Sequence, residues 1–275
     1  MQRTLAVALL FLGGLWTEAQ SQPVRWYKTL QEATAAAQET NKPIMIEFWA
    51  DWCAPCKVMD AEVYTDASVA AVIAQRLIPL RVSFDKEKTL VRQYNVEAIP
   101  FLAFTSSYGT ELLHHRGVLR AKELTAVIQA LPADVSEFNR WDRILQEDNG
   151  NLDALEKMAS QLRAAGLYQS SNEFYEKALK RDPAKKNSEL RQALLREMGL
   201  NFLDLQDGKK AASIFEQCMK ETPNNHDRPV FLLGLGRAYA LIKKKDQARK
   251  MLNALITEFP ESEPAREARR LLPQL

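Results

Sequence analysis

Cysteine and histidine are scarce in this chain of 275 residues, which contains 3 of each. A disulfide-stapled scaffold is excluded, because small folds of that kind carry several cysteine pairs. Tetrahedral zinc needs two ligand pairs at short spacings. Neither Cys218 nor any histidine supplies a second pair beside Cys53 and Cys56. Cysteine is therefore expected to serve chemistry here, with half of a zinc site and a purely structural disulfide as weaker alternatives.

An excess of either charge is also missing, because 37 basic residues stand against 35 acidic ones. No basic surplus indicates nucleic acid as a partner. Beyond residue 20 no apolar run is long enough to cross a bilayer. Residues 1–19 differ: Arg3 precedes an apolar stretch from Leu5 to Trp16, and Thr17–Ala19 offers a small-residue cleavage site. This pattern predicts a cleaved signal peptide, with an uncleaved N-terminal membrane anchor as the alternative.

The close cysteine pair lies in a setting typical of redox chemistry. Trp52–Cys56 follows a nearly continuous apolar run, Pro43–Ala50, which predicts a buried strand, and a helical pattern comes after it. A helix N-terminus stabilises negative charge, so Cys53 is expected to exist as a thiolate near neutral pH. Cys56 lies one turn further on, close enough to form a disulfide. The spacing therefore predicts thiol–disulfide exchange.

Strand and helix patterns alternate from residue 24 to residue 131, which predicts an α/β domain. We expect strands at 44–49, 78–84, 101–105 and 111–116. We expect helices at 26–40, 54–64, 68–76, 88–94 and 121–130. Residues 132–136 are predicted to be a linker.

The motifs in this order resemble the thioredoxin superfamily over residues 24–131. The local match is Phe48–Lys57, which contains the cysteine pair, followed by Ile99–Pro100 at the start of a strand. Within the superfamily, Ala50–Cys53 and Tyr64–Ser68 look most like the C-terminal domain of the exported disulfide reductase DsbD. The resemblance implies a thioredoxin fold and disulfide exchange with proteins.

The resemblance also assigns roles to the two cysteines. Cys53, expected to be exposed at the helix N-terminus, would be the attacking thiolate, and Cys56, buried one turn deeper, the resolving thiol. Glu47 is the single charge in its apolar strand, and thioredoxins place a proton-relaying aspartate there, beneath the resolving cysteine. A buried glutamate should have a raised pKa. The alternative is a strand glutamate that faces solvent.

The residues around the cysteines are expected to form the substrate surface. The resemblance implies a cis peptide bond at Pro100, facing the cysteines, and a backbone at Ile99 that pairs with a substrate strand. Trp52, Ala54 and Pro55 are assigned to substrate binding on the same ground.

After Pro132 the pattern becomes almost entirely amphipathic helix, with units of about 34 residues that recur at intervals of 40 and 37 residues. Small residues recur at Ala159, Gly199 and Gly236, and each is followed three positions later by a large one. This resembles the tetratricopeptide repeat and implies an all-α domain over 137–275. We expect repeats at about 152–185, 192–225 and 229–262, and then a capping helix at 264–272.

The combined prediction is a thioredoxin fold followed by a tetratricopeptide-repeat array, acting as an exported, periplasmic disulfide reductase. The redox-active disulfide is its only expected cofactor. Expected partners are protein disulfides, a membrane thiol-transporting electron donor and a protein bound by the repeats, with no nucleic acid. The alternatives are an envelope scaffold with a passive thioredoxin module, and a disulfide oxidase or isomerase.

Overall fold

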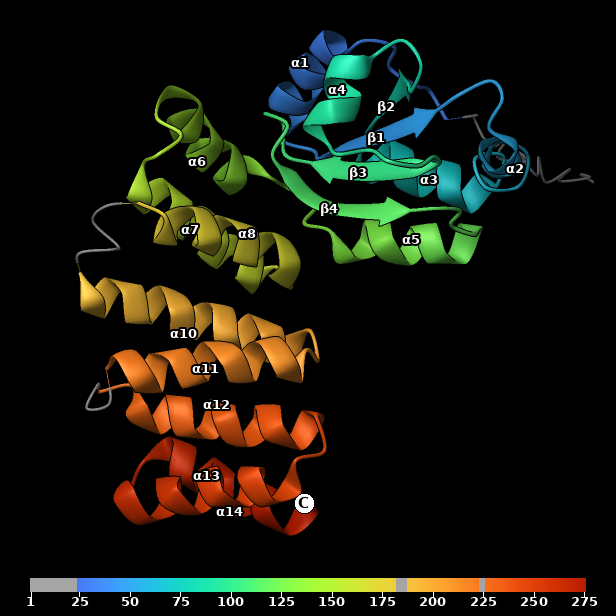
Figure 1. The fold of residues 1–275 in the computed structure, drawn as a ribbon. Coiled ribbons are helices and arrows are strands. Elements are labelled where there is room, and N and C mark those ends of the chain that lie inside the picture. Colours follow the sequence, from blue (N-terminus) through green and yellow to red (C-terminus); the bar gives the residue numbers. More distant parts are fainter. Residues whose placement is uncertain (1–23, 182–186, 223–225) are drawn as a thin grey trace, which may run out of the picture.

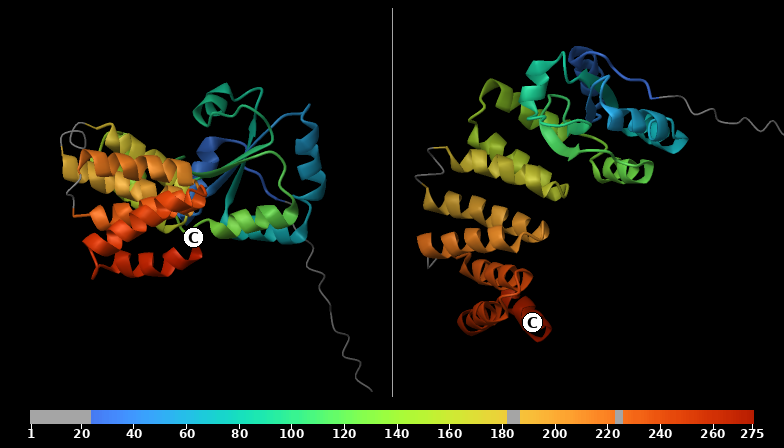
Figure 2. Two further views of the ribbon diagram at one scale, coloured as in Figure 1. Left: turned by 60° about the horizontal axis from the view of Figure 1, so that its bottom comes forward. Right: turned by 45° about the vertical axis from the view of Figure 1, so that its right-hand side comes forward.

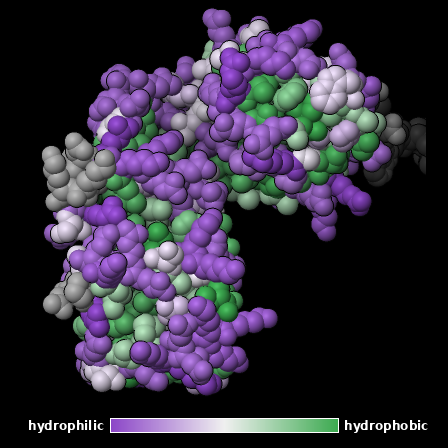
Figure 3. Space-filling view, in the orientation of Figure 1, coloured by the Kyte–Doolittle hydropathy of each residue, from purple (hydrophilic) through white to green (hydrophobic). Residues whose placement is uncertain are grey.

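A computed structural model describes residues 24–181, 187–222 and 226–275, and the predicted signal peptide and its alternative, a membrane anchor, lie outside these ranges. The described chain forms an α/β part and a stack of helices that meet at an angle (Figure 1). Two turned views show the same two parts (Figure 2). Hydrophilic side chains cover most of the face seen in Figure 3. Among the described residues no helix is both long enough and apolar enough to span a bilayer.

A four-stranded sheet with the order β2-β1-β3-β4 forms the centre of the α/β part. β1 pairs with β2 in parallel and with β3 antiparallel, and β3 and β4 form the predicted hairpin. The central strands are apolar on both faces because helices cover both of them. The strands are β1 (Ile44–Trp49), β2 (Ile78–Ser83), β3 (Phe101–Thr105) and β4 (Glu111–Arg116).

Side chains alternate between the two faces of β1, and each face meets a separate group of helices. Ile44, Ile46 and Phe48 pack in one cluster with residues of α1, while Met45 packs in the other with residues of α2, α3 and α5. The helices of this part are α1 (Leu30–Thr40), α2 (Ala54–Glu62), α3 (Ala67–Arg76), α4 (Lys88–Gln93) and α5 (Ala121–Ala130).

The first helix begins later than predicted, at Leu30 instead of residue 26. Tyr27 joins the edge of β2: its N–H donates to the Pro79 carbonyl at 2.8 Å, and its carbonyl accepts from the Arg81 N–H at 3.1 Å. Thr29 then caps α1 with its side-chain oxygen. A partner strand distant in sequence therefore overrides the helical pattern of residues 26–29.

The second part is a stack of antiparallel helices, which confirms the predicted fold class (Figure 1). Three helix pairs follow one another, and the second begins at Ser188 rather than at the expected residue 192. The helices are α6 (Ser136–Glu147), α7 (Leu152–Ala164), α8 (Tyr168–Leu179), α10 (Ser188–Asp204), α11 (Gly208–Glu221), α12 (Arg228–Leu241), α13 (Lys245–Glu258), α14 (Glu263–Leu271) and the short η1 (Leu272–Gln274).

The recurring small residues lie where helices of this stack touch. A Cβ atom at Gly199 would lie 2.6 Å from the Phe215 ring, and one at Gly236 would lie 2.4 Å from Leu252. Both distances are far below van der Waals contact, so only glycine permits the observed spacing. Gly199 and Gly236 therefore allow close packing between helices of the stack.

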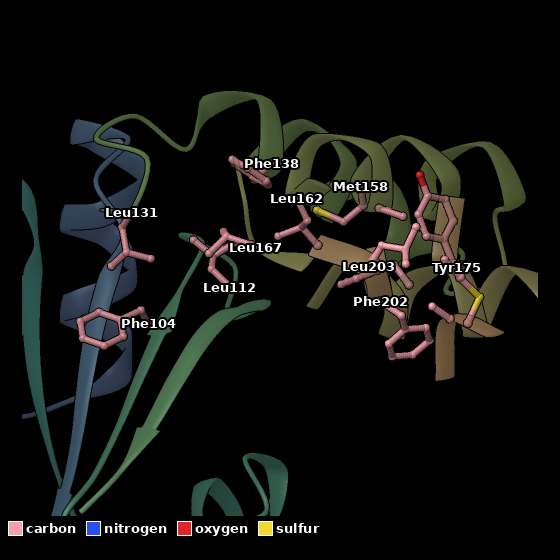
Figure 4. Close-up of a cluster of buried hydrophobic side chains, with 14 of the residues drawn as sticks. Phe104, Leu112, Leu131, Phe138, Met158, Leu162, Leu167, Tyr175, Phe202 and Leu203 are labelled. Atoms are coloured by element: carbon pink, nitrogen blue, oxygen red, sulfur yellow. The ribbon is translucent and has the colours of Figure 1, made fainter. Parts of the chain in front are cut away.

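The two parts share one apolar core. Figure 4 shows labelled side chains from the sheet, from α6 and from the helix stack in a single buried cluster. Val135 lies inside the predicted linker, yet it is fully buried and donates its N–H to the Asn41 carbonyl at 2.8 Å. Within residues 132–136, Val135 is therefore anchored to the α/β part.

Candidate active site

Cys53 and Cys56 form a disulfide at the N-terminus of α2, with their Cα atoms 5.3 Å apart. Cys53 is the N-cap of the helix, and its Sγ accepts the Cys56 N–H at 3.2 Å. Pro55 occupies the first turn, where a missing N–H has no effect on helix bonding. After reduction, the same N–H groups would stabilise a thiolate at Cys53.

Cys53 is less exposed than the sequence suggested, because only 2% of its surface is accessible. Its sulfur is bonded to Cys56, and Ile99 and Phe84 pack against the disulfide. The expectation of an exposed Cys53 is therefore wrong for the oxidised protein. Cys56 is completely buried, as predicted.

The peptide bond between Ile99 and Pro100 is cis, which confirms the prediction for that bond. Ile99 is half-buried and packs against the cysteine cluster, so the start of β3 lies beside the disulfide. The Pro100 carbonyl accepts the N–H of Gly117 at 2.9 Å. The loop that follows β4 is thereby held next to the cis-proline.

Trp52 directly precedes Cys53 in the chain, and 63% of its surface is exposed. Its indole Nε1–H donates to Oδ2 of Asp85 at 2.9 Å, and its ring meets Phe84 edge to face at 6.3 Å. Ala54 and Pro55 are also exposed. The three residues assigned to substrate binding thus lie on the open side of the cysteine pair, and their role stays a prediction.

Glu47 is fully buried, which rules out the alternative of a solvent-facing glutamate. The register places it opposite Arg81 on β2, and Arg81 Nε lies 2.8 Å from Glu47 Oε2. Arg81 also forms an ion pair with Asp60 on α2. Its guanidinium packs on the rings of Trp26 and Trp49, at 5.1 and 4.7 Å from the ring centroids.

Burial raises the pKa of Glu47 to about 7, although the positive charge of Arg81 opposes this shift. Oε1 of Glu47 and the hydroxyl of Tyr64 are both buried without a hydrogen-bond partner among the described residues. Burial and the adjacent charge of Glu47 also raise the pKa of Tyr64 well above its ordinary value. A carboxyl group with a pKa near 7 can accept and donate protons under physiological conditions.

No hydrogen bond joins Glu47 to Cys56 within the described ranges, so the predicted proton relay is not itself visible. The sequence prediction also missed Arg81, Asp60 and Tyr64 as neighbours of Glu47. One signal was available for Arg81. It interrupts the apolar run of β2 as Glu47 interrupts that of β1, but the pairing of the two strands is needed to bring them together.

Comparison with known proteins divides the chain in the same way as its structure. Residues 25–107 match the family model described as thioredoxin-like, and residues 202–272 match one described as tetratricopeptide repeat. The thiol:disulfide interchange protein DsbD of Yersinia pestis (strain Pestoides F) is 31% identical over 117 residues, which are 41% of this chain and 19% of that protein. DsbD 1 of Pseudomonas aeruginosa is 34% identical over 85 residues, 30% of this chain and 14% of the relative.

A crystal structure of the reduced DsbD C-terminal domain of Neisseria meningitidis is 25% identical, with a TM-score of 0.33 over 36% of this chain and 91% of that one. This chain spans about a fifth of the length of the DsbD protein of Yersinia pestis. The thioredoxin-like family match at residues 25–107 includes both cysteines of the disulfide. The chain therefore joins a thioredoxin-like domain, related to the DsbD disulfide oxidoreductases, to a tetratricopeptide-repeat array.

Proposed function

We propose that this protein is an exported reductase of protein disulfides whose repeat array docks a partner protein. The observation that carries the proposal is the Cys53–Cys56 disulfide at the N-terminus of α2, beside the cis bond before Pro100. A structural staple of this kind would close a loop too short to stabilise the fold much. Thiol–disulfide exchange, in contrast, uses the cysteine pair, the helix N-terminus that stabilises a thiolate, and the cis bond before Pro100.

The reaction transfers two electrons from the dithiol to the substrate. The Cys53 thiolate attacks one sulfur of the substrate disulfide, which forms a mixed disulfide and releases the other substrate sulfur as a thiolate. Cys56 loses its proton and attacks the Cys53 sulfur. The Cys53–Cys56 disulfide forms, and the second substrate sulfur leaves and takes up a proton.

Glu47 is proposed to accept the proton from Cys56. Its pKa of about 7 leaves a substantial fraction ionised at neutral pH, ready to take a proton. Arg81 and Asp60 would remain ion-paired with each other beside Glu47 while Glu47 gains and loses its proton. The rate at which Cys56 resolves the mixed disulfide reports this proton transfer.

The reducing direction rests on the residues between the cysteines. Ala54 and Pro55 resemble the reductive thioredoxins and lack the histidine that favours strong oxidants. Turnover outside the cytosol requires a dithiol donor that is itself reduced from inside the cell. The implied donor is a membrane protein that transports thiol electrons, and the periplasm is the proposed location.

Serine variants of the two cysteines test the proposal. Cys53→Ser should abolish reduction of a protein disulfide, whereas Cys56→Ser should accumulate mixed disulfides with substrates, seen as adducts on non-reducing gels. Cys218→Ala is the matched control, because Cys218 is buried and its pKa is raised to about 12. Full activity in Cys53→Ser would remove the cysteine pair from the function and favour the scaffold alternative.

A further inference from the structure

Helix α2 presents an apolar stripe to solvent that starts at the disulfide. Ala54, Val58 and Ala61 follow one another at helical spacing, and all three are exposed. The solvent face of such a helix normally carries charged residues. Five large apolar side chains are exposed in the described part of the chain: Trp52 precedes Cys53, Val58 lies on α2, Val118 follows β4, and Leu205 and Leu241 lie in the helix stack.

A groove of about 390 Å³ continues this stripe between α2 and the N-terminus of α5. In Figures 1 and 2 the N-terminal end of α5 lies next to α2. Val58 and Val118 expose 42% and 40% of their surfaces here. The groove is lined by Val58, Glu62, Val63, Val118, Arg120 and Ala121. We call it the α2–α5 groove.

Two chain segments connect this groove to the disulfide. The first is α2 itself, which runs from Cys53 to Val58. The second is the loop after β4, where the Gly117 N–H is bonded to the Pro100 carbonyl and Val118 follows directly. The α2–α5 groove is therefore linked to the disulfide through α2 and to the cis-proline through the loop that carries Val118.

The helix also sets the spacing between the groove and the reacting sulfur. At a rise of 1.5 Å per residue, Val58 lies about 7.5 Å along the axis from Cys53. An extended chain covers that distance in about two to three residues. A substrate side chain that close to the attacked cysteine would therefore reach the groove.

We infer that the α2–α5 groove binds the segment of a substrate protein that flanks its disulfide, and that it selects an apolar side chain two or three residues from the attacked cysteine. This inference rests on the proposed function. Val58 and Val118 contact that side chain. Glu62 and Arg120 supply one charge of each sign at the groove and can bond the polar backbone on either side of it.

Chromogenic peptides test the selection directly. Each peptide carries a single cysteine linked to 2-nitro-5-thiobenzoate, with Leu or Ser at the second and third positions on one side or the other. The reduced full-length protein, used stoichiometrically, should react with the better Leu peptide with a second-order rate constant about tenfold above that for its Ser counterpart, because the groove covers part of the Leu side chain.

Substitution of both valines should bring this ratio close to one. The variant Val58→Ser/Val118→Ser removes apolar surface from exposed positions, so its circular dichroism should match the parent protein. Leu241→Ser is the matched control, since Leu241 is 38% exposed but lies on α12 in the array. This control should keep the full preference for Leu.

The outcomes separate this inference from the proposed function. A reduced parent protein that releases no thiobenzoate from any peptide would contradict the function and the inference together. Release with equal rates for Leu and Ser peptides, or a preference that survives in the double variant, would overturn the groove alone. A parent dimer that the double variant converts to monomer would mark the groove as a contact between copies of this chain and also overturn the inference.

Discussion

At the scale of single residues, the fully buried Glu47 lies in an ion cluster whose other two members, Arg81 and Asp60, are partly exposed. Arg81 connects Glu47 to Asp60 and is itself held between two tryptophan rings. A buried carboxylate is unfavourable unless its charge is compensated, and the pKa of about 7 shows that compensation is incomplete. Such a group is expected where proton transfer is needed.

The stability of the oxidised protein should depend on the protonation of Glu47. Its pKa in the folded chain is raised, so between about pH 4.5 and pH 7 the folded state keeps a proton that the unfolded chain releases. The free energy of unfolding therefore falls as pH rises through this window, by about 3 kcal/mol from this group alone. Glu47→Gln lacks this dependence.

Urea unfolding of both proteins at pH 5 and pH 8 checks this expectation. The free energy of unfolding of Glu47→Gln, relative to the parent, should increase between the two pH values, since the titrations of all other groups cancel in the difference. The resolution of mixed disulfides should also be slower in the variant near neutral pH. Parallel stability curves together with equal resolution rates would remove Glu47 from the mechanism.

Sequence patterns predicted single residues well where the local context decided their environment. The isolated charge of Glu47 within an apolar run predicted its burial, and the position of Cys53 after a strand predicted the helix N-cap. The partnership with Arg81 was not predictable, because it depends on the register of a parallel pair 34 residues apart in sequence. The burial of Cys53 was not predictable either, because Ile99 and Phe84, which pack against the disulfide, are brought there by tertiary contacts.

At the scale of elements, helix α6 fastens the array to the sheet by a buried polar contact. Both carboxylate oxygens of Asp142 accept hydrogen bonds, from the hydroxyls of Ser106 and Thr110 in the β3–β4 turn. Asn139, one turn earlier, accepts the Ser107 N–H at 3.0 Å and donates to Asn41 at 3.2 Å. Residues of α6 therefore supply the hydrogen-bond partners for the β3–β4 turn.

Asp142→Ala should destabilise the protein by about 2 kcal/mol, because the buried hydroxyl of Ser106 and the partly buried hydroxyl of Thr110 lose their acceptor. Unfolding in urea, followed by tryptophan fluorescence, measures this loss. Glu261→Ala is a suitable control, since Glu261 is exposed between α13 and α14. A loss below about 0.5 kcal/mol, the range of ordinary surface substitutions, would show that the contact does not hold the parts together.

Periodicity predicted these elements more reliably than their connections. The hairpin strands and α5 have the predicted bounds, because apolar spacing and turn residues fix them locally. Residues 132–136 were expected to be a linker, yet Val135 is buried against the α/β part. A single apolar residue in a short connection does not reveal whether a neighbouring surface will cover it, because that surface exists only after folding.

At the scale of the whole molecule, the array joins the sheet at the end opposite to the disulfide. The β3–β4 turn contacts α6, whereas the disulfide lies near the start of β3. Figure 1 shows the array at the far end of the sheet from α2. A partner held by the array would therefore leave the cysteine pair open to substrate, as the proposed docking role requires.

The standard redox potential of the Cys53–Cys56 pair in the full chain is the most direct test of the central claim. Equilibration with glutathione or dithiothreitol buffers, followed by quantitative thiol labelling, gives the potential. A reductase should have a redox potential of about −270 mV, as in thioredoxin. A redox potential of about −120 mV, typical of a strong oxidant, would contradict the reducing direction.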